Sequence, residues 1–380
     1  MLGACLLGQK KYAEAEPLLV AAYEGLKWRE HRIPPAAKPR LREALERLVQ
    51  LNESLAVESP GNVEDRQQLA AAYRQLLNLT TNAGPLAAQD CSRALALTDK
   101  IIALARSDTN TAPGEAALWH DKGKLLEAAG RREEALQAMT KAIELASTNT
   151  NGYPLTSAKA RLSRSDLLRR MSRLAEAGDD RCQALNFPRR DPQAKTNLVD
   201  LSLFYNGNLE QNRRGGIPGN NLGALPEGVR SLADVQFDVR GLIQLAGTNL
   251  RDAYPPSVAG IPIHRRFAQL HVLHATNFSE ADATRIGAYV LHYEDGQERE
   301  LPIRYGEDVL NWWRSEKDLD ATQAAVAWTG QNPAATKSKA TLRLFKRTWE
   351  NPRPEVEVES IDFTSTVTQC APFLIALTLE

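Results

Sequence analysis

The sequence predicts α and β structure in separate domains, with a stack of helices over residues 1–190 and an antiparallel β-sandwich over residues 191–380. Of the 23 aromatic residues, 7 lie within 1–196 and 16 within 197–380. The first half is rich in Ala, Leu, Glu, Arg and Gln, which favour helices, whereas the second is rich in residues that favour strands and turns. Ala94, Ala135 and Ala177 recur 41 and 42 residues apart, which indicates stacked repeats.

The best-defined repeat unit covers residues 115–148. Its large and small residues follow one another at intervals of 4, 3, 4, 5, 4 and 3, namely Trp119, Gly123, Leu126, Gly130, Ala135, Met139 and Ala142. In this pattern a large side chain opens the first helix, a small one lets the second helix approach, and a glycine turns the chain. The unit resembles the tetratricopeptide repeat, which implies an α-solenoid of tetratricopeptide repeats whose concave surface holds a peptide or protein.

Other segments fit the same register less completely. Residues 1–26 match a unit that lacks the start of its first helix, so we expect the first repeat to be truncated at Met1 and the chain to be a piece of a longer protein. Residues 62–106 and 154–188 form further units, and residues 38–55 add one helix. Residues 2–51 resemble the repeat tails of serine/threonine kinases from Planctomycetes and Verrucomicrobia. The chain has no kinase motif, so a regulatory tail of a larger signalling protein is an alternative function.

The second half shows short strand patterns instead of helical ones. Apolar or alternating runs predict strands at 198–205, 235–245, 268–275, 287–293, 298–305, 323–328, 340–347, 356–363 and 373–379. Asp295-Gly296 lies between two of these runs and predicts a hairpin, because this dipeptide tolerates the positive φ of a tight turn. Many short strands separated by turns indicate an antiparallel sandwich.

A second resemblance rests on four stretches of this half, at 225–228, 235–241, 270–276 and 290–296. The most telling is Val235-Gln236-Phe237-Asp238-Val239-Arg240-Gly241. These stretches resemble the galactose-binding-like family, and especially the carbohydrate-binding modules found beside bacterial glycosidases. The resemblance implies a jelly-roll sandwich that binds a glycan, binds a protein or is purely architectural. We expect Asp238 and Arg240 to form a structural ion pair.

Candidate partner-binding residues are polar positions on the first helices of two repeats, off the packing face. They are His120, Lys124, Glu127, Asp166 and Arg169. Their side chains would line the concave surface and contact a peptide or protein partner. The alternative is an ordinary solvated helix surface, where charged residues are usual.

Candidate glycan-binding residues lie near the ends of predicted strands. They are Tyr305, Trp312, Trp313, Trp349, Asn351 and Arg353. Sugars present C–H faces that stack on indole rings, while neighbouring polar groups bond to hydroxyls. The alternative is that the rings fill the core, and we expect at least one of Trp312 and Trp313 to do so.

The sequence offers no catalytic constellation, so we expect neither enzymatic activity nor a cofactor. We expect no metal site, because His271 and His274 would face opposite sides of a strand. The alternative is a structural calcium ion in the oxygen-rich loops 206–221 and 277–282. The 47 basic and 47 acidic residues cancel, which argues against nucleic acid as a partner. No apolar run reaches the roughly 18 residues needed for membrane insertion.

Four scattered cysteines do not decide the compartment, which is cytoplasmic by default and extracytoplasmic if the chain belongs to a membrane-anchored protein. The function predicted is a non-enzymatic protein–protein interaction scaffold that uses the helical repeats, with the β-sandwich as a second binding or architectural module. A carbohydrate-binding protein that acts through the sandwich is the other alternative.

Overall fold

The computed structural model divides into two compact units, residues 1–173 and 174–380, and each is described by itself. The structure describes residues 2–27, 38–58, 68–69, 71–73, 75–76, 88–106, 112–148, 154–212, 217–315 and 320–380. The first unit ends earlier than the expected boundary at 190. Helix α9 (Leu174–Leu185) packs within the second unit, where Arg181 Nε donates to the Tyr205 carbonyl at 2.7 Å and Asn208 Nδ2 donates to the Leu185 carbonyl at 2.7 Å.

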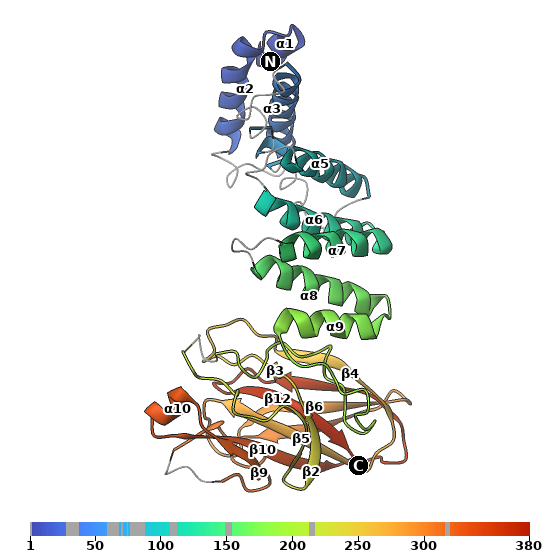
Figure 1. Ribbon diagram of the computed structural model, residues 1–380, viewed down its shortest axis with the longest axis vertical. Coiled ribbons are helices and arrows are strands. Elements are labelled where there is room, and N and C mark those ends of the chain that lie inside the picture. Colours follow the sequence, from blue (N-terminus) through green and yellow to red (C-terminus); the bar gives the residue numbers. More distant parts are fainter. Residues whose placement is uncertain are drawn as a thin grey trace. The chain divides into compact units, whose positions relative to one another are not determined.

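The first unit is a succession of helices that pack on their neighbours in the chain (Figure 1). The helices are α1 (Leu2–Gly8), α2 (Tyr12–Lys27), α3 (Lys38–Glu58), α5 (Ala88–Arg106), α6 (Ala112–Ala128), α7 (Arg132–Thr148) and α8 (Pro154–Arg170). This arrangement confirms the helical-repeat half of the predicted fold. Most of the helix expected over 63–79 lies outside the described residues.

The repeat is visible in contacts between helices that are not consecutive. Arg93 of α5 pairs with Glu46 of α3, and seven residues later Lys100 Nζ lies 2.6 Å from Glu53 Oε1. Seven residues are about two helical turns, so α3 and α5 run parallel with one face of each towards the other. Parallel helices separated by another helix are what a stack of helix pairs produces.

Small residues set the close approach of α6 and α7. A Cβ on Gly123 would lie 2.7 Å from Met139 Cγ, so only glycine fits there without a shift. Ala135 is fully buried on the facing side of α7. Gly130 turns the chain between the two helices with a φ of 76°, in the left-handed region that glycine adopts readily. These three residues have the positions that the repeat pattern predicted.

The second unit contains antiparallel β-structure, as expected. Its elements after α9 are β1 (Gly228–Leu232), β2 (Val235–Val239), β3 (Ile243–Gln244), β4 (Ser257–Arg265), β5 (Gln269–Asn277), β6 (Arg285–Tyr293), β7 (Glu298–Arg304), β8 (Trp313–Arg314), β9 (Ala325–Gly330), α10 (Pro333–Lys337), β10 (Thr341–Glu350), β11 (Val358–Ser365) and β12 (Ala371–Leu379). Strands β1 and β2 form a separate hairpin.

Two larger sheets share one apolar core. One has the order β3-β12-β5-β10, with β8 and β9 also paired to β10, and the other has the order β4-β11-β6-β7. Tyr289 of β6 lies 5.6 Å, centroid to centroid, from Trp349 of β10, and stacks on Phe363 of β11 at 5.0 Å. Because these rings come from both sheets, the core lies between the sheets.

Two differences from the expected strands have local causes. The strand expected at 198–205 is a turn after a single bridge at Leu198, because the Asp200 carboxylate accepts the Ser202 amide at 3.0 Å and bends the chain. Strand β4 was not expected, because Gly260 and Pro262 weaken its pattern. As the end strand of its sheet, β4 tolerates a proline that cannot donate to a ladder.

Candidate functional site

The candidate partner-binding residues lie on helices α6 and α8, which contact each other directly. His120 Nε2 of α6 lies 2.9 Å from Ser163 Oγ of α8, and Glu127 pairs with Arg170. Each helix advances seven residues between these contacts, so α6 and α8 run parallel in the same way as α3 and α5. Lys124 lies between the two contacts on α6.

On α8, the two remaining candidates differ in exposure. Asp166, which follows Ser163 by three residues, is half-buried, whereas Arg169 is exposed, as is Lys124 on α6. Positions three and four residues apart on a helix share a face. The structure therefore brings Lys124, Glu127 and Asp166 together on what we call the α6–α8 face, with Arg169 beside Arg170 at its end.

His120 does not have the exposed position expected of it. The residue is 3% exposed, and its Nδ1 lies 3.4 Å from Asp121 Oδ1 while its Nε2 meets Ser163. Its side chain joins two repeats instead of facing a partner. The spacing that placed it beside Lys124 was correct, but the adjacent helix α8 covers it, which sequence alone does not reveal.

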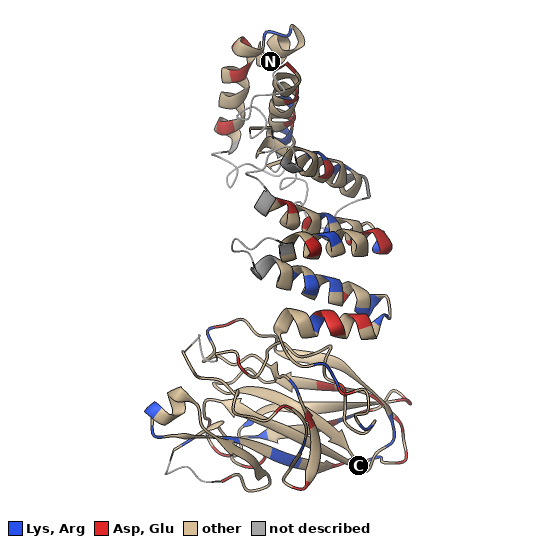
Figure 2. Cartoon of the chain, in the orientation of Figure 1, with Lys and Arg blue, Asp and Glu red and all other residues tan. Residues whose placement is uncertain are grey.

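The α8 end of this face is rich in positive charge. Between residues 154 and 173 the chain has a single carboxylate, Asp166, and six basic residues, Lys159, Arg161, Arg164, Arg169, Arg170 and Arg173. Figure 2 shows the basic segments along α8. Arg164 donates a hydrogen bond to Thr140 at 2.8 Å, and Arg170 pairs with Glu127. Lys159 and Arg169, by contrast, are exposed. Net positive charge on an exposed face favours an acidic partner segment.

Most of the aromatic glycan candidates lie in the core of the second unit. Trp312 has no exposed surface and packs edge-on against Phe373, with ring centroids 6.2 Å apart. Trp349 and Tyr305 are also buried, at 8% and 7% exposure. Trp313 is half-buried, and its Nε1 donates to Asn220 Oδ1 at 3.1 Å. A sugar cannot stack on the buried rings of Trp312, Trp349 and Tyr305, which leaves only the half-buried Trp313 among these four rings.

Trp349 belongs to a buried cluster around His274. The Nε2 of His274 lies 3.1 Å from the Asp308 carbonyl oxygen, which can only accept, so Nε2 carries the proton. Nδ1 then accepts from the Tyr289 hydroxyl at 3.3 Å. Burial lowers the pKa of His274 to about 3, so the ring is neutral in the folded protein. Arg347 covers the Trp349 ring at 5.0 Å and pairs with Asp308 at 2.7 Å.

Asn351 and Arg353 brace the β6–β7 hairpin. Asn351 Oδ1 accepts from the Tyr293 hydroxyl at 2.5 Å and from the Arg353 amide at 3.0 Å, and Asn351 Nδ2 donates to the Phe267 carbonyl at 2.9 Å. Arg353 lies over the Tyr293 ring and holds both carboxylate oxygens of Asp295, at 2.7 and 3.1 Å. The amide of Asn351 has its bonds within the protein, so a structural role accounts for it.

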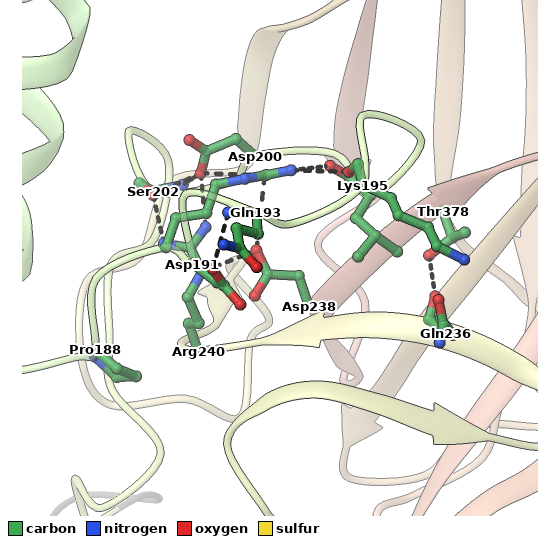
Figure 3. Close-up of polar contacts among 12 residues, drawn as sticks. Pro188, Asp191, Gln193, Lys195, Asp200, Ser202, Gln236, Asp238, Arg240 and Thr378 are labelled. Atoms are coloured by element: carbon green, nitrogen blue, oxygen red, sulfur yellow. Dashed lines mark hydrogen bonds and ion pairs between the residues drawn. The ribbon is translucent and has the colours of Figure 1, made fainter.

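A buried ion cluster around Arg240 joins the loop before residue 202 to the end of β2 (Figure 3). Arg240 donates to Asp238 at 3.0 Å, to Ser202 at 2.7 Å and to Asp200 at 2.6 Å. Burial would raise the pKa of Asp200, but the bonds from Ser202 and Arg240 outweigh it and hold the pKa below its usual value. Burial raises the pKa of Asp238, against the effect of Arg240 and Arg190. Burial of Arg240 and Asp238, with the three bonds of Arg240 all made within the protein, indicates a structural cluster.

Sequence reasoning missed a pocket on the second unit, where β8, β10 and the segment around α10 meet. Its lining comes from residues 314–315, 331, 336 and 339–341. No pattern in the sequence connects these segments. The pairing of Thr341 in β10 with Arg314 in β8, and of Leu342 in β10 with Gly330 in β9, brings them together.

No metal ligands gather within the described ranges, where no group of three or more His, Cys, Asp or Glu side chains is placed to hold an ion. In the loop proposed for calcium, the side-chain oxygens of Asn206 and Asn208 accept backbone amides of Gln244 and Gln211, at 2.8 and 2.6 Å. Among the helices that the structure describes, none combines the length and the apolar character needed to cross a membrane.

Comparison with known proteins gives distant likenesses to repeat proteins. No family model matches the chain, and no curated protein matches its sequence. Among solved structures, BtubC (BKLC) from P. vanneervenii is 18% identical over 40% of this chain and 56% of its own, with a TM-score of 0.32. A putative kinesin light chain with TPR-like repeats from Podosopora anserina is 16% identical over 48% and 89%, with a TM-score of 0.29. MamA from AMB-1 is 20% identical over 48% and 85%, with a TM-score of 0.25.

These neighbours cover about half of the chain. The match spans 56% of the length of BtubC, so more than two fifths of that protein has no counterpart here. At such TM-scores the likeness carries no argument about function. The assignment of TPR-like repeats to the first unit rests on its own packing: the Gly123 contact, the buried alanines and the parallel helix pairs.

Proposed function

We propose that this protein is a non-enzymatic interaction scaffold that holds a peptide or protein partner on the α6–α8 face. The observation that carries the proposal is the pair of contacts His120–Ser163 and Glu127–Arg170, between which Lys124 is exposed. They align two parallel helices into one continuous polar surface, which a flexible segment can follow over two turns of each helix. Arg169 at the end of that surface adds exposed positive charge.

For the second unit we propose a jelly-roll module that serves as a second binding or architectural element. The strand orders β3-β12-β5-β10 and β4-β11-β6-β7 support this topology, because strands consecutive in the chain mostly alternate between the two sheets. Burial of Trp312 and Trp349 removes the aromatic platform on which a glycan site was expected.

The scaffold proposal is tested with charge reversal on the full chain. Lys124→Glu and Arg169→Glu, alone and together, are compared with the native protein on an array of 12-residue peptides graded from net −6 to net +6. Lys141→Glu is the matched control, because the side chain of Lys141 on α7 is 43% exposed and its contact, with Glu144 at 3.1 Å, is within its own helix. We expect the native protein and the control to bind the acidic peptides, and the double variant to lose at least tenfold in affinity.

Two results would contradict the proposal. One is equal binding by the double variant and by the native protein. The other is the same loss in the Lys141→Glu control, which would show a general charge effect instead of a surface on α6 and α8. Circular dichroism at 222 nm on each variant separates loss of binding from loss of helical structure.

A further inference from the structure

The pocket on the second unit is an open surface depression whose size is that of a small-molecule site. It is open to solvent and has a volume of about 680 Å³. Pockets that hold small ligands range over roughly 300–1,000 Å³. Its lining residues are Arg314, Ser315, Gln331, Thr336, Lys339, Ala340 and Thr341. All of them belong to one compact unit, so the pocket needs no second part of the chain to complete it.

The lining offers hydrogen-bond donors and positive charge. Arg314 and Lys339 are cationic, and no acidic residue is among the described residues that line the pocket. Asp320 Oδ1 lies 3.3 Å from Arg314 Nη1, but a guanidinium has five N–H donors and one carboxylate does not saturate them. The Thr336 hydroxyl donates to Gln331 Oε1 at 2.9 Å, which leaves the amide nitrogen of Gln331 as a further donor.

Lys339 is held in place by an unusual backbone conformation. Ser338 caps α10, and the next amides return to the helix: Lys339 N donates to the Thr336 carbonyl at 3.1 Å and Ala340 N to the Ala335 carbonyl at 2.9 Å. This is the Schellman arrangement, which usually has glycine at the position of Lys339. Lys339 has a φ of 52°, which strains a residue with a side chain. The same bonds satisfy carbonyls in the last turn of α10.

We propose that this pocket binds a small anionic molecule, a phosphate ester or a carboxylate, between the Arg314 guanidinium and the Lys339 ammonium group. Both groups are charged at neutral pH, and Arg314 presents a planar fork that matches either anion. Lys339 is exposed and makes no ion pair with any residue that the structure describes. The site is independent of the α6–α8 face.

The test uses the full chain and two probes, glycerol 3-phosphate and citrate, at constant ionic strength with chloride as the reference anion. Isothermal titration calorimetry gives the dissociation constant. Tryptophan fluorescence, to which four of the six tryptophans contribute from the second unit, follows the melting temperature. The variants are Arg314→Gln and Lys339→Gly. Lys337→Gln is the matched control, because Lys337 is an exposed lysine of the same short helix that does not line the pocket.

We expect at least one probe to bind with a millimolar or lower dissociation constant and to raise the melting temperature by about 2 °C or more at saturating concentration. Arg314→Gln weakens binding at least tenfold, and Lys337→Gln changes it less than twofold. Lys339→Gly has two opposite effects: it abolishes the ligand-induced rise, and it raises the melting temperature of the free protein because glycine relieves the positive φ. Preference for glycerol 3-phosphate or for citrate identifies the class of anion.

The proposal is overturned if neither probe raises the melting temperature beyond the chloride reference. It is also overturned if Arg314→Gln and Lys339→Gly bind the probe as the native protein does, or if Lys337→Gln loses as much affinity as they do. Because Lys339→Gly is expected to fold at least as well as the native chain, loss of binding in that variant does not come from unfolding.

Discussion

Replacement of Arg240 by methionine is the sharpest test of the buried ion cluster in the second unit. Arg240 is 1% exposed and donates to three acceptors, and its loss would leave Asp238, whose side chain is 2% exposed, with Arg190 at 3.6 Å as the remaining cation. Removing one partner of a buried pair costs about 3–5 kcal/mol. Arg190 compensates in part for the lost charge, and methionine keeps the packing over the Tyr205 ring. We therefore expect the free energy of unfolding to fall by about 3 kcal/mol.

The assay is urea unfolding followed by tryptophan fluorescence, to which Trp312, Trp313, Trp328 and Trp349 of the second unit contribute. Arg353→Met is the matched control, because Arg353 also lies over a tyrosine ring and pairs with a carboxylate, but that carboxylate, Asp295, is 37% exposed, so its loss of a partner leaves no buried charge. The double variant Asp238→Leu/Arg240→Met should recover most of the loss, because no unpaired buried charge remains. The reasoning fails if Arg240→Met lowers the free energy of unfolding by no more than Arg353→Met does.

Three further predictions concern stability. The pKa of His274 is about 3 in the folded protein and near 6.5 in the unfolded chain. Its contribution to the stability of the fold is therefore complete above about pH 6.5 and is lost as the pH falls towards 3. Between pH 7 and 5 the native protein should lose about 2 kcal/mol, and His274→Asn should flatten that slope in urea titrations. Gly123→Ala should destabilise the first unit by about 1 kcal/mol, because the close contact of the new methyl group with Met139 costs more free energy than the higher helix propensity of alanine gains. Circular dichroism at 222 nm measures the unfolding, and a variant more stable than the native protein would refute this prediction. Asn351→Ala should lower the free energy of unfolding in urea by about 3 kcal/mol, because the Tyr293 hydroxyl and the Phe267 carbonyl lose their hydrogen-bond partner. A decrease below about 1 kcal/mol would contradict the role of Asn351 in bracing the hairpin.

The helical half was the more predictable part of the fold. Gly123, Gly130 and Ala135 could be assigned to a close contact, a turn and a packed face because helix pairing in repeats depends on residues near one another in the chain. The same local pattern placed Lys124 correctly on an exposed face. It failed for His120, because the neighbour that buries His120 is Ser163 on α8, two helices later.

The strand half was predictable in kind and less so in detail. Alternating runs identified most strands, but β1, β4 and β8 were missed, and in β4 Gly260 and Pro262 interrupt the pattern. Trp312 was foreseen as a ring that either binds ligand or fills the core, and the sequence could not choose between the two. The choice depends on Phe373, which lies 6.2 Å away on β12 and about sixty residues later in the chain.

Sequence alone therefore determined the order of the two architectures, the repeat spacing of the helices and the antiparallel character of the sheets, because all three follow from periodicities within a few turns or one hairpin. Tertiary structure decided which polar and aromatic side chains remain available to a ligand. Exposure depends on what packs over a residue from elsewhere in the chain: α8 over His120, the opposite sheet over Trp349, and the pairing of β8 with β10 that brings Arg314 to the pocket it shares with Lys339.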